Sequence, residues 1–269
     1  MDAQFLTLIT LLLYLAAGLA FGMRLFASPD SYRPPRIAGM SLGYIALLVH
    51  GYLLYLALFT LSGINLSFFN ALNLFGWTVS ALLLISALNK PVENLAIALF
   101  PITALILVTD FRFTGTHMLP ADATLSLKAH VLTSVLSYAM LTLATVQALL
   151  LAVQNNHLKH HHPGGFIRAL PPLQTMETLL FEMIWLGFVL LTIALGTGFI
   201  YLESMFAQQV VHKTILSILA WLTFGALLAG RYRFGWRGRK AIHWTIVGFT
   251  ILVLAYFGSK AVLELILER

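Results

Sequence analysis

Histidine is the side chain in this sequence that is most able to do site chemistry. The chain has nine histidines and ten acidic residues but no cysteine, which excludes disulfides, thiolate metal sites and iron–sulfur clusters. It contains no H-E-x-x-H sequence, no phosphate-binding glycine loop and no Ser-His-Asp order. No carboxylate pair lies at helical spacing inside an apolar stretch, and Glu182 is a weak exception. The residue types therefore favour ligation by imidazole.

Three of the histidines within apolar stretches or at their ends are candidates for a site. His50 is inside the stretch 37–60, where an imidazole needs a polar partner or a cavity. It is either a functional residue or the partner of a neighbouring helix in a hydrogen bond. His130 and His212 begin two further stretches on one side of the membrane, and each taken alone could be structural. Together they predict a site in which two imidazoles bind a haem iron from both sides.

A cluster of four further histidines and a group of five phenylalanines can each be interpreted in two ways. His157 and the run His160-His161-His162 form either a metal site or a solvated polar loop, and their lack of helical spacing favours the loop. Five phenylalanines near the same side as His130 form either an aromatic belt or a surface for stacking a porphyrin. They are Phe68, Phe69, Phe113, Phe199 and Phe206.

The elements that must position these residues are membrane spans. Of the 269 residues, 59% are hydrophobic and 10% are charged, and the mean hydropathy is +0.89. Soluble domains have about 25% charged residues, so an ordinary soluble enzyme is excluded. The sequence predicts an all-α polytopic membrane protein, a bundle of eight transmembrane helices that forms one integral-membrane domain over 1–269. The predicted spans are 5–22, 37–60, 69–88, 94–109, 130–153, 179–201, 211–230 and 242–261.

Basic residues predict the orientation of these spans. Eleven of the sixteen Lys and Arg residues fall in or beside the loops on one side of the predicted bundle, and five fall on the other. The positive-inside rule makes the first side cytoplasmic. We therefore expect the basic loop 231–241 in the cytoplasm and both termini in the periplasm of a bacterial inner membrane. This loop is interpreted as an anchor on anionic lipids, so the partner is the lipid bilayer and no nucleic acid is expected.

Several segments, mostly in the second half of the chain, carry a further pattern. A histidine precedes a small-residue helix, a double proline precedes a glycine-containing helix, and an aromatic helix ends in a basic glycine-rich turn. The segments are His130-Val131 to Ser137-Tyr138-Ala139, Leu170-Pro171-Pro172-Leu173, Leu186-Gly187-Phe188 to Gly196-Thr197-Gly198, Ala220-Trp221 to Lys240-Ala241, Gly248-Phe249 and Tyr256-Phe257-Gly258, with a weaker match from Leu66-Ser67 to Trp77. They resemble the cytochrome c assembly family of membrane haem-handling proteins (CcsA/CcmC-like) over about residues 65–260.

The resemblance implies roles for individual residues. His130 is similar to the axial haem ligand of the family, and His50 resembles the membrane-embedded histidine of some members. Haem-delivering members carry a tryptophan-rich WWD segment, which is missing from the corresponding stretch 201–213. The chain in this respect resembles the HemX-like inner-membrane branch. His212 is our own candidate for a second iron ligand and is not carried over from the family.

Two functions follow as expectations. The first is a membrane haem-binding or haem-handling accessory protein in cytochrome c biogenesis or haem homeostasis, with haem as cofactor and cytochrome c assembly or haem-biosynthesis proteins as partners. Such a protein would bind and present haem without turnover, so we do not expect it to be an enzyme. The alternative is a non-haem membrane scaffold or regulator of a biosynthetic or membrane partner protein. A transporter is disfavoured because mirrored broken helices and charged midplane residues are lacking.

Overall fold

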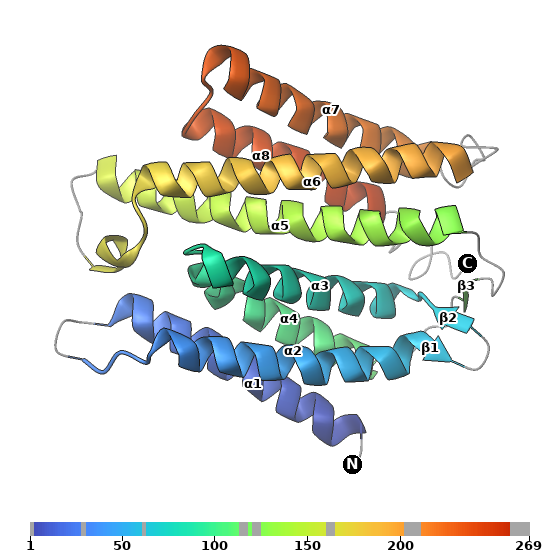
Figure 1. The fold of residues 1–269 in the computed structure, drawn as a ribbon, viewed down its shortest axis with the longest axis horizontal. Coiled ribbons are helices and arrows are strands. Elements are labelled where there is room, and N and C mark those ends of the chain that lie inside the picture. Colours follow the sequence, from blue (N-terminus) through green and yellow to red (C-terminus); the bar gives the residue numbers. More distant parts are fainter. Residues whose placement is uncertain are drawn as a thin grey trace. The chain divides into compact units, whose positions relative to one another are not determined.

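The computed structural model describes residues 3–27, 31–60, 63–112, 118–119, 125–159, 165–201 and 211–258. Each predicted span overlaps an α-helix in these ranges, which confirms the prediction of an all-α membrane protein (Figure 1). Positions 259–261 of the last predicted span lie outside the described residues. Six of the helices are long and apolar enough to cross a membrane. The other two, Ala96–Arg112 and Arg239–Val253, are shorter, so the count of eight spans stays a prediction.

The helices group into two compact units. Unit 1 comprises residues 1–121 and 161–171, and unit 2 comprises residues 122–160 and 172–269. Each unit contains four of the α-helices, and each is described here by itself. The prediction of one integral-membrane domain over the whole chain stays a prediction.

Unit 1 is a ring of four helices. Helices α1 and α3 each pack against both α2 and α4. The four helices are α1 (Ala3–Phe26), α2 (Arg36–Leu58), α3 (Phe68–Asn89) and α4 (Ala96–Arg112), and two short 3-10 turns, η1 (Glu93–Leu95) and η2 (Gly165–Ala169), complete the unit. Three short antiparallel strands, which the sequence did not predict, lie beyond the end of α2. They are β1 (Phe59–Thr60), β2 (Gly63–Asn65) and β3 (Met118–Leu119), with Phe59 opposite Ile64 and Asn65 opposite Met118.

Small residues let the helices of unit 1 approach closely. A methyl group added at Gly39 of α2 would lie 2.8 Å from the ring of Phe21 in α1. One added at Gly18 would lie 3.5 Å from the ring of Pro101, the proline inside α4. Helix association in a membrane depends on such close packing because lipid supplies no hydrophobic driving force.

Unit 2 is also a ring of four helices. Helices α5 and α7 each pack against both α6 and α8, so α5 and α7 occupy opposite corners. The π-helical turn η3 continues α8. The elements are α5 (Leu125–Lys159), α6 (Leu173–Tyr201), α7 (Val211–Phe234), α8 (Arg239–Val253) and η3 (Leu254–Gly258).

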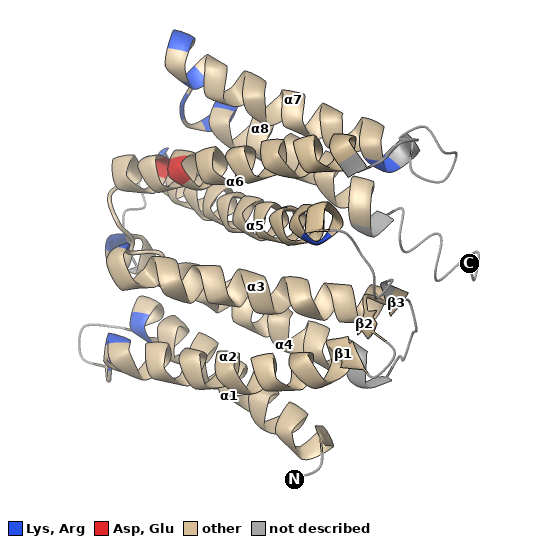
Figure 2. Ribbon diagram, turned by 45° about the vertical axis from the view of Figure 1, so that its right-hand side comes forward, with Lys and Arg blue, Asp and Glu red and all other residues tan. Residues whose placement is uncertain are grey.

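Basic residues gather at one end of each unit (Figure 2). In unit 1 this is the end where α1 and α3 finish and α2 and α4 begin, and in unit 2 it is the end where α7 finishes and α8 begins. The residues are Arg24, Arg33, Arg36 and Lys90 in unit 1, and Arg231, Arg233, Arg237, Arg239 and Lys240 in unit 2. This is the distribution on which the predicted orientation depends.

Candidate functional site

His130 lies in the second turn of α5, and helix α6 holds its ring. Its Nδ1 atom is 2.7 Å from the carbonyl oxygen of Ala194. A carbonyl oxygen only accepts hydrogen bonds, so Nδ1 donates to it, and in the neutral ring Nε2 carries the lone pair. Within the described part of the chain, Nε2 makes no hydrogen bond. His130 is therefore half-buried with its Nδ1 anchored, and in the neutral ring its Nε2 is able to bind a metal.

A glycine of α6 makes room for this ring. A methyl group added at Gly198 would lie 3.0 Å from Cε1 of His130 and 3.2 Å from Nδ1. Gly196, one further glycine in the same helix, has open space at the corresponding position. Helix α6 is continuous through both glycines, and Gly198 serves the contact with His130.

His212 is the second residue of α7, at the end of unit 2 where α5 also begins. Its side chain lies outside the described residues. Because α5 and α7 occupy opposite corners of the four-helix ring, they have α6 and α8 as their neighbours. The predicted pairing of His130 with His212 stays a prediction.

His50 is fully buried in unit 1 and forms a hydrogen-bonded chain with two other helices. Its Nε2 is 2.8 Å from Oδ1 of Asn73 in α3, and its Nδ1 is 3.2 Å from the hydroxyl of Tyr14 in α1. Asn73 Oδ1 only accepts, so Nε2 donates to it and the Tyr14 hydroxyl donates to Nδ1. One neutral tautomer thus satisfies both ring nitrogens. Ligation of a metal by His50 requires the loss of one of these two bonds.

One partner of His50, Asn73, belongs to a polar stripe on α3 that sequence reasoning missed. Asn70, Asn73, Trp77 and Ser80 follow one another at intervals of three or four residues, which places them on one face of a helix. Asn70 donates to backbone carbonyl oxygens at 57 and 65, Trp77 donates to that of Leu47, and Ser80 bonds Thr103. This spacing of polar residues in an apolar stretch was the available signal. Tyr14 gave no comparable signal, because nothing in its own span marks it as the partner of His50.

The other sequence candidates do not form a site in the described part of the chain. His157 bonds the carbonyl oxygen of Val153 in its own helix at 3.0 Å, and His243 is exposed. The run 160–162 and His117 lie outside the described residues, as do Phe113 and Phe206. The described ranges contain no group of three or more His, Asp or Glu side chains that could hold a metal ion. Phe68 and Phe69 pack edge to face on each other, and Phe199 is exposed on α6.

Comparison with known proteins decides the family. Residues 39–267 match the family described as cytochrome C assembly protein. The chain belongs to the cytochrome c assembly protein family. The predicted resemblance is confirmed, and the match is longer than the predicted 65–260. It includes His50, Asn73, His130 and His212, whereas Tyr14 precedes it.

Relatives within this family cover part of the chain. Inner membrane protein YpjD of Escherichia coli strain K12 is 40% identical over 151 residues, which are 56% of this chain and 56% of YpjD. An uncharacterized 28.8 kDa protein of Azospirillum brasilense is 34% identical over 140 residues, 51% of this chain and 52% of the relative. A cytochrome c biogenesis protein CcsA of Prochlorococcus marinus subsp. pastoris is 27% identical over 196 residues, 65% of this chain and 61% of CcsA. The chain thus matches little more than half the length of these relatives. No solved structure matches it.

Proposed function

We propose that this protein binds haem at the end of unit 2 where α5 begins, and that it serves cytochrome c biogenesis or haem homeostasis as an accessory protein without catalytic turnover. The observation that carries the proposal is the state of His130. Its Nδ1 donates to the Ala194 carbonyl oxygen at 2.7 Å, which leaves Nε2 for iron. Metal-binding histidines usually donate their other ring N–H to a carbonyl or carboxylate, because this bond fixes the tautomer and the ring orientation.

The geometry of His130 supports its role as a haem ligand. His130 would bind the iron through Nε2, and His212 of α7 is our candidate for the second axial position. Haem bound by two histidines supplies a closed, low-spin iron centre suited to storage or transfer and not to oxygen chemistry. The Ala194 carbonyl and the space at Gly198 hold the His130 ring in place. His50 is a further candidate, either as an entry position for haem or as a structural residue bonded to Tyr14 and Asn73.

The family supports the cellular context of this proposal. CcsA relatives are cytochrome c biogenesis proteins, and the YpjD relative is an inner membrane protein. We therefore place this chain in a bacterial inner membrane, with cytochrome c assembly or haem-biosynthesis proteins as partners and no nucleic acid. The proposal is completed by eight spans, with both termini in the periplasm and the 231–241 loop in the cytoplasm. This orientation follows from the positive-inside rule, because basic residues gather at one end of each unit and the 231–241 loop lies at that end of unit 2.

One observation favours the alternative of a non-haem scaffold or regulator. The turn between α7 and α8 exposes aromatic rings beside four exposed basic side chains. Tyr232 is 90% exposed and Phe234 is 76% exposed. Such a surface suits contact with a partner protein as well as with lipid headgroups. In that case unit 2 would need no cofactor.

The visible absorption spectrum of the purified protein tests the proposal. The protein is expressed with an ample haem supply, purified in a mild detergent, and measured oxidised and reduced. We expect a Soret band and sharp α and β bands on reduction, the signature of a low-spin bis-histidine haem. His130→Ala and His212→Ala should each abolish the low-spin spectrum, and added imidazole should restore it in His130→Ala. A colourless wild-type protein would favour the scaffold.

Matched histidine variants distinguish ligation from general damage. His157→Ala removes a histidine from the other end of the same helix, and His243→Ala removes an exposed one from α8. Both should keep the spectrum of the wild-type protein. If His130→Ala keeps it as well, His130 is not a ligand. If only His212→Ala keeps it, the second axial ligand lies elsewhere.

A further inference from the structure

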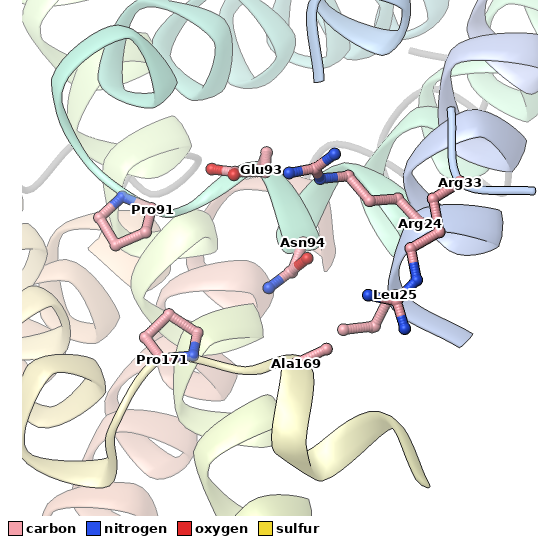
Figure 3. A pocket seen from close by; sticks show the side chains of 8 residues that line it. All are labelled: Arg24, Leu25, Arg33, Pro91, Glu93, Asn94, Ala169 and Pro171. Atoms are coloured by element: carbon pink, nitrogen blue, oxygen red, sulfur yellow. The ribbon is translucent and has the colours of Figure 1, made fainter. Parts of the chain in front are cut away.

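A polar cavity lies at the basic end of unit 1, and no histidine is among the residues that line it (Figure 3). Its volume is about 290 Å³. It is lined by the last turn of α1, the segment before α2, the turn η1 and the end of the η2 segment. The side chains that matter here are Arg24, Leu25, Arg33, Glu93 and Asn94.

Among the described residues of the lining, the one acidic group already has a basic partner. Glu93 Oε1 is 3.1 Å from Nε of Arg36, and Glu93 Oε2 is 3.4 Å from an Nη atom of the same guanidinium. Arg36 also donates to the carbonyl oxygen of Ala87, so α2, α3 and η1 are tied together at this point. The side chain of Glu93 is 15% exposed, and the guanidinium of Arg36 neutralises its charge. The remaining charge of the lining is therefore positive.

Two guanidinium groups supply that charge and keep most of their donors. Arg24 donates one N–H to the carbonyl oxygen of Pro34 at 3.3 Å, and Arg33 donates one to that of Ala27 at 3.3 Å. These two bonds hold the chain segments on either side of the connection between α1 and α2. A guanidinium has five N–H donors. Within the described ranges neither arginine forms an ion pair, so both retain donors for an incoming anion.

The surroundings of the cavity combine this charge with apolar surface. Leu25 lines the cavity and is buried, while Leu19, Met23 and Phe26 form an exposed stripe that leads along α1 to the same end. Phe26 packs on Phe166 of η2, with ring centroids 5.2 Å apart. An anion bound here lies at the point where an apolar, lipid-exposed helix surface meets a pair of arginines.

We propose that this cavity is a binding site for a phosphate group. Two arginines and an amide side chain match the planar, multidentate recognition that phosphate oxygens favour. The phosphate belongs either to an anionic phospholipid, whose acyl chains lie along the stripe of α1, or to a small phosphate compound from solution. The site is independent of haem, because no residue of unit 2 contributes to it.

Binding measurements on the full-length protein in neutral detergent test this site. The probes are phosphatidylglycerol in mixed micelles, phosphatidylcholine in mixed micelles, and inorganic phosphate without lipid. The readouts are the dissociation constant and the phospholipid retained in native mass spectra. Each of Arg24→Gln and Arg33→Gln should weaken binding about tenfold, the scale of one charge-assisted hydrogen bond. Lys128→Gln removes one charge from an exposed position at the start of α5, away from the basic end of unit 2, and should change binding less than about twofold.

The outcomes separate the two sources and the failure of the proposal. Binding of phosphatidylglycerol but not of inorganic phosphate, lost in the cavity variants, assigns the site to a lipid. Binding of inorganic phosphate that is lost in the same variants assigns it to a soluble compound. Equal weakening in the cavity and control variants, or no binding of either probe, overturns the proposal. Arg33 is exposed and outside the helices, so Arg33→Gln should fold and tests the site if Arg24→Gln does not fold.

Discussion

Gly198 of α6 lies so close to His130 of α5 that a methyl group at the glycine would be 3.0 Å from the imidazole ring. The same ring donates to Ala194, one helical turn earlier on α6. The position of the candidate iron ligand is therefore set by the backbone of the neighbouring helix, through one carbonyl group and one missing side chain. Substitutions on α6 should therefore change the position of the His130 ring although His130 itself is unaltered.

Gly198→Ala should displace the His130 ring and weaken or shift the low-spin haem spectrum. The added methyl group makes a contact closer than nearly all found in proteins, so either the ring or the helix must move. Gly196→Ala is the matched control, since it adds the same methyl group to an exposed position of the same helix. It should keep the spectrum and, by helix propensity, raise stability by up to about 1 kcal/mol. Identical spectra for the two variants would show that the contact does not position an iron ligand.

His50 should contribute mainly to the stability of unit 1. His50→Leu removes a partner from both Tyr14 and Asn73 inside the core, so we expect the free energy of unfolding to fall by about 1–3 kcal/mol. Tyr14→Phe removes one hydroxyl from the same chain and should lower it by about 0.6 kcal/mol, the average for such bonds between membrane helices. Unfolding in sodium dodecyl sulfate, followed by circular dichroism, measures both. Loss of haem binding in His50→Leu with the stability unchanged would instead make His50 a haem residue.

The sequence predicted the helices well where hydropathy marks them and less well at their ends. The predicted span 130–153 is the apolar centre of α5, which begins at Leu125 and ends at Lys159. The predicted span 179–201 is similarly the apolar part of α6, which begins at Leu173, directly after Pro172. Hydropathy measures the part of a helix that prefers lipid, whereas backbone hydrogen bonds continue through polar turns. The short strands beyond α2 have no comparable signal.

The candidate site shows the same division. His50 and His130 could be selected from sequence because an imidazole near a membrane core needs a partner. Their partners could not, since Ala194 contributes only its backbone and Tyr14 comes from a separate span. The phosphate cavity was also missed, because Arg24, Arg33 and Glu93 come from three segments that only the packing of α1, α2 and η1 brings together. Sequence spacing predicts sites within one helix and is silent about those shared between several.

Glu177 of α6 should stabilise the turn between α7 and α8. Its carboxylate accepts the backbone N–H of Gly238 at 2.8 Å, and Gly238 has a positive φ of 52° at the start of α8. The group is 8% exposed, so the bond is shielded from water. We expect Glu177→Ala to lower the free energy of unfolding by about 1.5–3 kcal/mol, the range for hydrogen bonds to charged groups. The melting temperature of the purified protein measures this.

Gln174→Ala is the control for that prediction, because Gln174 is an exposed polar residue on the same helix. Its effect should stay within about 0.5 kcal/mol, as for most surface substitutions. Equal melting temperatures for the two variants would mean that the bond to Gly238 contributes nothing measurable.

The predicted topology requires the two shorter helices, α4 and α8, to cross the membrane as well. Helix α4 has 17 residues, which gives about 26 Å at about 1.5 Å per residue, less than the bilayer core of about 30 Å. If α4 nevertheless crosses, Lys90 before it and Leu125 after it lie on opposite sides of the membrane. The chain has no cysteine, so single cysteines can be introduced and labelled with an impermeant maleimide in spheroplasts.

Leu125→Cys should be labelled in intact spheroplasts, because Leu125 is exposed at the predicted periplasmic start of α5. Lys90→Cys and Arg237→Cys should be labelled only after permeabilisation, because the basic ends of both units face the cytoplasm by the positive-inside rule. Cysteines at 90 and 125 that react from the same side would show that α4 does not cross. Labelling of all three in the opposite sense would invert the orientation while keeping the spans.

The result at Leu125 also gives the side of the membrane on which His130 lies, since His130 is little more than one turn further along α5. A cytoplasmic Leu125 would move the proposed haem site to the cytoplasmic side and so contradict its outer position.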